Sequence, residues 1–198
     1  NKDGVIFEGK RLNRGGQKKA ILSSDDAAAE PLLRKIRSTL SGISTFPWFN
    51  VGAGGDFASP IRAPTKSDEE AVLSPTGANL PAVLARLHAI RPKDFAVYIE
   101  RLRLAFPRLV QITFPPAGGS FIVMKWWESK SGADHTPDVS FDAGELSDGT
   151  LQYMCALATV FEEGTSLVVI DEPELHLHPG LVHLLVGALL ERARLLPI

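Results

Sequence analysis

This sequence of 198 residues contains a single cysteine, no long apolar run and no large excess of either charge. The single cysteine, Cys155, rules out an intrachain disulfide and fits a reducing compartment. Because no apolar stretch is long enough to span a bilayer and no signal peptide is recognisable, we expect a cytoplasmic protein without a membrane partner. A net charge of −2 gives no overall attraction to nucleic acid, although a local basic patch is compatible with it.

A phosphate-binding loop of the G-x-x-x-x-G-K-[ST] type is also missing. Residues 4–10 have the spacing of its first seven positions, but Arg11 stands where Ser or Thr would ligate Mg²⁺. The residues between the two glycines are bulky strand formers, so we interpret residues 3–15 as a β-hairpin. The glycine-rich residues 52–55 are followed by Asp56 with no lysine nearby, and we interpret them as a turn.

The composition is that of an ordinary globular domain, with 44% hydrophobic and 22% charged residues. The length suits one domain, or one domain with a small subdomain. Hydrophobic periodicity divides the chain into four parts. They are residues 1–46 with the hairpin and a helix at 24–40, residues 47–78 as a loop or insertion, residues 79–108 as two helices, and residues 109–198 as a β part followed by helix, strand and helix.

Basic side chains gather at two places in the sequence. The first group falls off the apolar stripe of its predicted helix and the second is a cluster, and we interpret both groups as solvated. For the first group, a patch that contacts phosphates is the sharper alternative. The first group is Arg34, Lys35 and Arg37, and the second is Arg101, Arg103 and Arg108.

An apolar segment that ends in two carboxylates lies at residues 167–172. Its uninterrupted, mostly β-branched run predicts a strand buried on both faces of a parallel sheet. Asp171 and Glu172 follow the run, and Pro173 stops the strand. Because ligands bind at the carboxyl ends of strands in open α/β sheets, this pair can hold Mg²⁺ and orient a water for phosphoryl transfer. The alternative is an acidic strand end without a catalytic role.

A second motif, Leu146–Thr150, immediately precedes a helical pattern. Ser147 or Asp148 can cap this helix, and Gly149 lets a ligand or another backbone come close. A helix N-terminus with free N–H groups attracts anions, although a plain helix cap is the alternative interpretation. The apolar residues that share one face of the helix are Leu151, Met154, Cys155, Ala158 and Phe161.

These two motifs carry a resemblance to a known family. Leu146–Thr150 resembles the signature motif of ABC-type ATPases, residues 167–172 resemble their Walker B strand, and residues 173–179 resemble the D-loop. The form D-E-P-E-L-H-L-H-P is similar to the SMC-like and recombination-repair branch, which includes AAA ATPases of bacterial DNA-repair and phage-defence systems. Asp148 and Thr150 replace the glycine and glutamine of transporter signatures, which favours this branch over transporters.

The resemblance implies an α/β fold, a P-loop NTPase-like (ABC-type) nucleotide-binding domain with a helical subdomain and an antiparallel β part. It implies that Asp171 holds Mg²⁺ and that Glu172 is the general base. In this family the ATPase lobe would include residues 1–46.

The same resemblance assigns the cofactor-binding positions. Ser147, Asp148 and Gly149 form the ATP-binding signature, in which Ser147 and Gly149 occupy the positions that meet the γ-phosphate bound to the opposite subunit. His178 falls at the D-loop position at the dimer interface. A metal site at His176 and His178 is the alternative, but the spacing matches no zinc signature.

The function implied is ATP binding and hydrolysis by an SMC-like ATPase, with head-to-tail homodimerisation driven by ATP and coupled to DNA repair or phage defence. ATP and Mg²⁺ are the implied cofactors, and DNA and an effector protein or domain are further candidate partners. Without a phosphate loop we expect this chain not to bind ATP tightly by itself; with such a loop upstream of Asn1, two copies would enclose two ATP molecules head to tail. Two alternatives stay open: a degenerate module that binds a partner without hydrolysis, and DNA binding as the primary activity.

Overall fold

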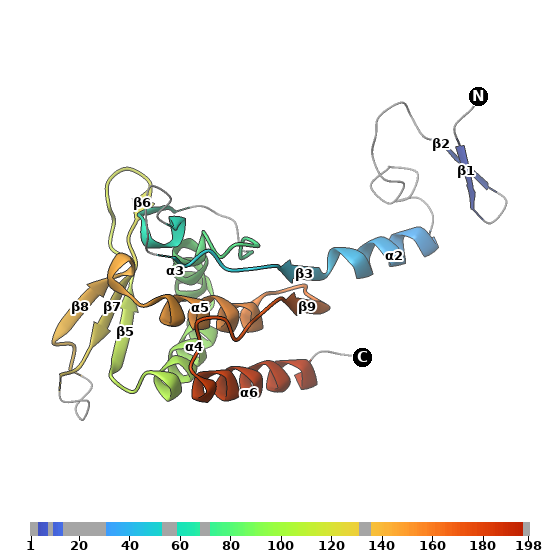
Figure 1. Ribbon diagram of the computed structural model, residues 1–198. Coiled ribbons are helices and arrows are strands. Elements are labelled where there is room, and N and C mark those ends of the chain that lie inside the picture. Colours follow the sequence, from blue (N-terminus) through green and yellow to red (C-terminus); the bar gives the residue numbers. More distant parts are fainter. Residues whose placement is uncertain are drawn as a thin grey trace. The chain divides into compact units, whose positions relative to one another are not determined.

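The computed structural model describes residues 4–7, 10–13, 31–52, 59–67, 72–130 and 136–195 (Figure 1). The chain divides into two compact units. The smaller consists of Asn1–Ser44 with Gly164–Leu167, and the larger of Thr45–Glu163 with Val168–Ile198.

The smaller unit contains the predicted hairpin. Strands β1 (Gly4–Phe7) and β2 (Lys10–Asn13) pair antiparallel, with Gly4 opposite Asn13 and Phe7 opposite Lys10. Because the backbone of these two strands is extended and paired, it cannot wrap around a phosphate. The predicted hairpin is therefore confirmed, and the G-x-x-x-x-G-K spacing does not indicate a phosphate loop. Helix α2 (Pro31–Ser41) ends before Gly42. The first residues of the helix predicted at 24–40 lie outside the described residues.

The larger unit is built mainly of helices packed beside a small antiparallel sheet (Figure 1). Pro92 separates its first two helices, because proline cannot continue the hydrogen bonding of the preceding helix. The elements are η2 (Pro60–Arg62), β4 (Thr65–Lys66), α3 (Leu80–Ile90), α4 (Pro92–Ala105), β5 (Leu109–Thr113), β6 (Phe121–Ile122), β7 (Lys125–Glu128), β8 (Val139–Asp142), η3 (Ala143–Glu145), α5 (Asp148–Ala158), η4 (Thr159–Phe161) and α6 (Pro179–Leu195).

Helix α5 is the centre of the hydrophobic core. It packs against α3, α4 and α6, and every residue from 151 to 158 is buried. The sequence predicted that only one face of α5 is buried. Tyr153 and Leu157, which lie off that face, are also buried, because neighbouring helices cover α5 on several sides. Within this core the Tyr98 hydroxyl donates to the Met154 carbonyl oxygen at 3.0 Å. The predicted packing role of Cys155 is confirmed by its complete burial.

The antiparallel β part has the strand order β5-β7-β8. Trp126 in β7 is 2% exposed and packs edge-on against Phe106, whereas Trp127 lies on the opposite face of the strand and donates its indole N–H to the Thr113 hydroxyl at 2.9 Å. Alternation along a strand places neighbouring side chains on opposite faces, so one of the two tryptophans joins the core.

Strands β3 (Ile43–Phe46) and β9 (Leu167–Ile170) are neighbours in a two-stranded sheet. The Gly42 carbonyl accepts from the Ser166 N–H, and the Phe46 carbonyl accepts from the Asp171 N–H. The residue numbers of both strands increase in the same direction from the first bond to the second, so the pairing is parallel.

The burial predicted for β9 on both faces was wrong. Leu167 is 49% exposed and Val169 is 46% exposed, whereas Val168 and Ile170 pack on the core. Among the described residues, the core packs only against the face of β9 that carries Val168 and Ile170, so the face that carries Leu167 and Val169 stays exposed.

Helix α6 starts at Pro179, because the fixed backbone angle of proline suits the first helical turn. Leu185 and Ala188 pack it into the core of the larger unit. Among the residues that the structure describes, no helix is both long enough and apolar enough to cross a membrane.

Candidate functional site

The signature loop ends in a capped helix. Ser147 has an extended backbone (φ −67°, ψ 154°), and its hydroxyl oxygen accepts the Thr150 N–H at 3.1 Å. Of the two predicted caps, Ser147 is therefore the one that the structure uses, while Asp148 becomes the first helical residue. The cap satisfies one of the free N–H groups at the start of α5 and leaves the exposed Ser147 hydroxyl at the helix end.

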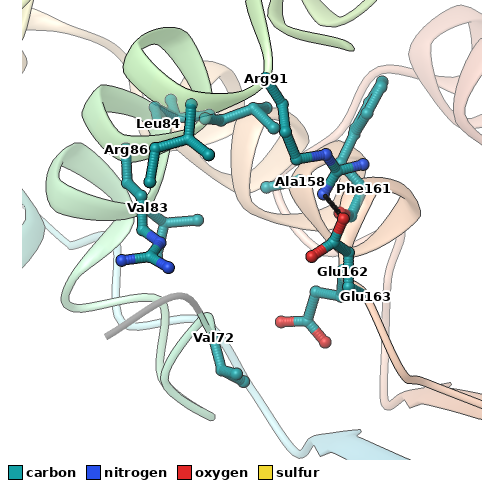
Figure 2. Close-up of a pocket in the computed structure, with 11 residues that line it drawn as sticks. Val72, Val83, Leu84, Arg86, Arg91, Ala158, Phe161, Glu162 and Glu163 are labelled. Atoms are coloured by element: carbon teal, nitrogen blue, oxygen red, sulfur yellow. Dashed lines mark hydrogen bonds and ion pairs between the residues drawn. The ribbon is translucent and has the colours of Figure 1, made fainter. Parts of the chain in front are cut away.

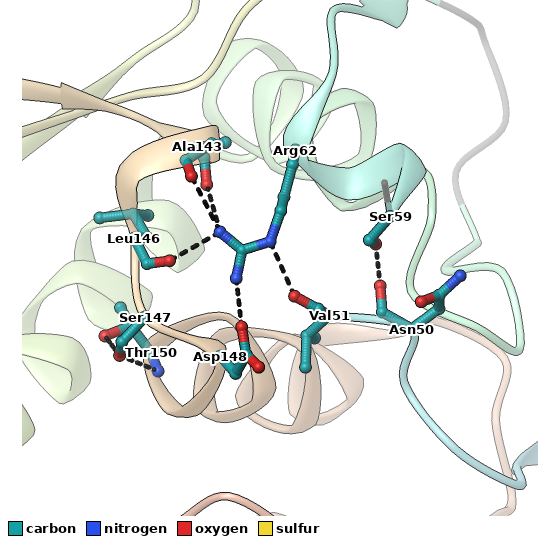
Figure 3. A network of polar contacts seen from close by, with 10 residues as sticks. Asn50, Val51, Ser59, Arg62, Ala143, Leu146, Ser147, Asp148 and Thr150 are labelled. Atoms are coloured by element: carbon teal, nitrogen blue, oxygen red, sulfur yellow. Dashed lines mark hydrogen bonds and ion pairs between the residues drawn. The ribbon is translucent and has the colours of Figure 1, made fainter. Parts of the chain in front are cut away.

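An arginine that the sequence analysis missed holds this loop in place (Figure 3). The Arg62 side chain is 6% exposed, and its guanidinium reaches carbonyl oxygens on both sides of the site. It donates to Val51 at 2.8 Å, to Gly144 at 3.0 Å and to Leu146 at 2.7 Å. No sequence signal points to Arg62, because it lies in the segment interpreted as a loop or insertion, 84 residues before Leu146.

Asp148 pairs with the same arginine. Its carboxylate oxygen Oδ1 lies 2.5 Å from Nη2 of Arg62, and the Asp148 side chain is 38% exposed. Arginine keeps its positive charge at all physiological pH values, so the negative charge at the first turn of α5 has a fixed, buried counter-charge.

Gly149 brings the signature motif against the predicted D-loop. A Cβ atom built at Gly149 would stand 2.6 Å from the carbonyl oxygen of His176, a distance that no real side chain tolerates. Only glycine fits this close approach of two backbones. The structure thus joins two motifs that the sequence showed only as separate segments.

The acid pair lies at the end of β9. The Asp171 N–H donates to the Phe46 carbonyl at 3.0 Å, and both the Asp171 and Glu172 side chains are exposed. Glu172 has a φ of +45°, and its carbonyl accepts the Leu175 N–H at 3.0 Å in the turn that follows. Exposed carboxylate oxygens directly after a strand are suitable ligands for Mg²⁺.

Backbone strain concentrates in this turn. Among the described residues, Glu172 and His176 are the non-glycine residues with positive φ, at 45° and 63°. Side-chain-bearing residues in the left-handed region cost free energy, and such residues cluster at functional sites. The strain therefore marks the segment from Glu172 to His176.

The two D-loop histidines do not form a metal centre. The His178 ring nitrogen Nδ1 accepts the Gly180 N–H at 3.2 Å, close to the start of α6, and both His176 and His178 are exposed. Among the described residues, no group of three or more His, Cys, Asp or Glu side chains is placed to hold a metal ion. The nearby residues Glu174 and His183 therefore do not complete a metal site with the two histidines, and the alternative hypothesis of a metal site has no support from the described residues.

A cavity elsewhere in the larger unit can be set aside (Figure 2). It has a volume of about 90 Å³, and its lining includes Val72, Leu84, Ala158 and Glu162. The acid pair and residues 146–150 contribute nothing to this lining. One of its two arginines, Arg91, donates to the Phe161 carbonyl at 2.9 Å and pairs with Glu163 at 3.3 Å.

A family comparison determines the class of the protein. The family described as "AAA domain, putative AbiEii toxin, Type IV TA system" matches residues 86–196, more than half of the chain. The chain belongs to this family of AAA domains. The matched segment of this AAA domain includes residues 146–150, α5, the acid pair Asp171 and Glu172, and residues 173–179. Comparisons with curated proteins and with solved structures found no match.

Family membership confirms the coarser expectations from the sequence. An AAA domain has the α/β fold of P-loop NTPases and an ATPase-like activity, and such domains use ATP and Mg²⁺. The residues present fit this metal: Asp171 and Glu172 offer exposed oxygen ligands at the end of β9. The ABC-type and SMC-like assignments are finer than the family match.

Proposed function

We propose that this AAA domain is the ABC-type, SMC-like half-site of an ATPase, in which ATP drives head-to-tail homodimerisation. Ser147, Asp148 and Gly149 would face the nucleotide held by the opposite subunit, with His178 at the interface. Asp171 would hold Mg²⁺, and Glu172 would act as the general base on the attacking water.

The close approach of Gly149 to the His176 carbonyl carries this proposal. An ordinary helix cap needs no contact with a loop beyond a distant strand, whereas a composite phosphate site needs both segments on one surface. The contact unites the signature loop, which attracts anions at a helix N-terminus, with the turn that starts at the acid pair. A charged nucleotide is the ligand that both chemistries suit.

The chain's own residues divide the chemical work. Bound Mg²⁺ would neutralise phosphate charge and polarise the phosphoryl oxygens. The exposed Glu172 carboxylate accepts a proton from water, and its strained backbone fixes the direction in which its side chain leaves the turn. Ser147 offers a hydroxyl, and the start of α5 offers backbone N–H groups and the positive end of a helix dipole.

The biological setting is proposed from the family. Its description names a toxin–antitoxin system, which favours a defence setting over DNA repair as the process that ATP-driven closure serves. An effector protein or domain is then the partner that would respond to dimer closure.

The decisive test replaces Glu172 by Gln in the full-length protein. We expect hydrolysis to fall by at least about 100-fold, the contribution typical of a general base, while ATP-driven dimerisation persists. Steady-state phosphate release and sedimentation velocity with ATP measure the two quantities. An unchanged hydrolysis rate would exclude Glu172 as the base.

Glu174→Gln is the matched control. Glu174 lies two residues further along the same turn and is exposed, but it does not belong to the acid pair. We expect its variant to hydrolyse ATP at the wild-type rate. Equal losses in both variants would indicate general damage to the turn.

The degenerate module without hydrolysis is the second candidate. Such a module would lack a G-x-x-x-x-G-K-[ST] segment throughout the full-length protein, and residues 1–198 contain none. It predicts that neither Mg²⁺-ATP binding nor hydrolysis is detectable in the full-length protein, which calorimetry and phosphate release would establish.

DNA binding as the primary activity is less well supported. The arginines at 101–108 already have protein partners: Arg101 pairs with Glu191, Arg103 donates to the Leu109 and Val110 carbonyls, and Arg108 donates to the Ser129 carbonyl. Arg108 is nevertheless exposed over 57% of its side chain, as expected for a solvated residue. A steep loss of DNA affinity with salt would revive this candidate.

A further inference from the structure

We propose that Arg62 is a positioning residue that keeps the signature helix receptive to phosphate, by anchoring its loop and by neutralising Asp148. This inference rests on the proposed function, because it concerns the same phosphate-facing end of α5.

The first role of Arg62 is mechanical. The guanidinium of Arg62 donates to the carbonyls of Gly144 and Leu146, the residues that lead into the signature motif. From its Nε it donates to Val51, which is 2% exposed. A buried fork of hydrogen bonds to backbone leaves the loop a single conformation, so the Ser147 hydroxyl and the N–H groups of α5 are held in place before a ligand arrives.

The second role of Arg62 is electrostatic. Asp148 places a carboxylate in the first turn of α5, where it stabilises the helix dipole. The same carboxylate would repel a phosphate that approaches that helix end. Its contact with Nη2 of Arg62 at 2.5 Å brings the net charge of the pair to zero and leaves the helix dipole free to attract an anion.

The mechanical and the electrostatic role predict different effects of substitutions at positions 62 and 148. An anchor that is only mechanical is lost when Arg62 is replaced, whatever residue stands at 148. A counter-charge, in contrast, becomes dispensable once the charge of Asp148 is also removed. The double variant therefore separates the two roles.

The experiment compares wild type, Arg62→Met, Asp148→Asn and the double variant of the full-length protein. Association of subunits is measured by sedimentation against the concentration of Mg²⁺ and the non-hydrolysable analogue AMP-PNP. We expect Arg62→Met to raise the half-saturating concentration by about fivefold, the effect of one unscreened charge near 4 Å in water. Adding Asp148→Asn should recover the electrostatic part of this loss, and the defect that remains measures the mechanical anchor.

Salt gives a second readout that a purely structural role would not move. At about 1 M salt the screening length is about 3 Å, so the defect of Arg62→Met should shrink. A double variant as weak as Arg62→Met, or a defect independent of salt, would overturn the counter-charge role.

Two further variants guard against misfolding. If Arg62→Met does not fold, Asp148→Asn alone carries the test: association should be as strong as in wild type or stronger, and a loss beyond about fivefold would overturn the proposal. Arg91→Met is the matched control, since Arg91 pairs with Asp94 at 2.5 Å on another helix. We expect this control to leave association unchanged.

The outcome also separates this inference from the function on which it rests. Wild-type protein that shows no association with AMP-PNP would overturn the proposed function, and the role of Arg62 with it. Wild-type protein that associates, combined with no rescue in the double variant, would overturn the role of Arg62 alone.

Discussion

The Cα of Gly149 faces the carbonyl oxygen of His176 so closely that a methyl group on it would stand 2.6 Å from that oxygen. This contact connects the start of the buried helix α5 with the strained turn after β9. Movement of either segment must move the other, because two backbones in van der Waals contact have no flexible side chain between them to absorb a shift.

Gly149→Ala tests this contact. The added methyl group should displace the turn, lower the free energy of unfolding by about 1–3 kcal/mol and abolish ATP-driven association. Urea denaturation and sedimentation measure the two effects. Gly187→Ala in α6 is the control: its Cβ would meet no atom within 4 Å, so we expect a gain of about 0.5–1 kcal/mol. Similar losses in both variants would contradict the close packing at Gly149.

The strained backbone of Glu172 makes a prediction about stability. At a φ of +45°, glycine should give a free energy of unfolding about 1 kcal/mol higher than alanine, because only the methyl group of alanine is strained there. Urea denaturation of Glu172→Gly and Glu172→Ala measures the difference. At Glu174, which lacks a positive φ, alanine should be at least as stable as glycine. The same order at both positions would argue against the strain.

The two roles of Ser147 can be separated by charge. Ser147→Ala should lose about 1 kcal/mol of stability with the cap to Thr150, whereas Ser147→Asp should retain it, because aspartate is an equally good cap. The carboxylate of Ser147→Asp would nevertheless repel phosphate and weaken ATP-driven association. Thermal denaturation and sedimentation distinguish the effects. Normal association of Ser147→Asp would place the phosphate elsewhere.

The buried thiol makes stability fall at alkaline pH. Burial raises the pKa of the Cys155 thiol and of the Tyr98 hydroxyl, so the folded state keeps protons that the unfolded state releases. The stabilisation is complete below the unfolded thiol pKa of about 8.5 and is lost as the pH rises above it. Between pH 9 and 10, Cys155→Ala should flatten this decline by about 1.4 kcal/mol per pH unit. Parallel declines in urea denaturation would contradict the burial.

The local elements could be predicted from the sequence where one strong signal acts over a few residues. Pro179 marks the start of α6, and the alternation around Trp126 places one tryptophan in the core. Ser147 was one of two candidates for the cap of α5, and the structure chose it by the backbone conformation of the loop. The exposure of one face of β9 could not be predicted. An apolar run shows that a strand is suited to burial, but it does not show which elements cover each face.

The sequence by itself determined the class of this protein and the chemistry available to it: a signature-like loop before a helix, and two carboxylates after an apolar strand, in a chain that belongs to a family of AAA domains. Only the tertiary structure decided that Gly149 meets the His176 backbone and that Arg62 anchors the loop and pairs with Asp148. Both relationships join residues far apart in the chain through backbone atoms and a buried charge. Local periodicity carries no information about such contacts, since they depend on how the elements pack in three dimensions.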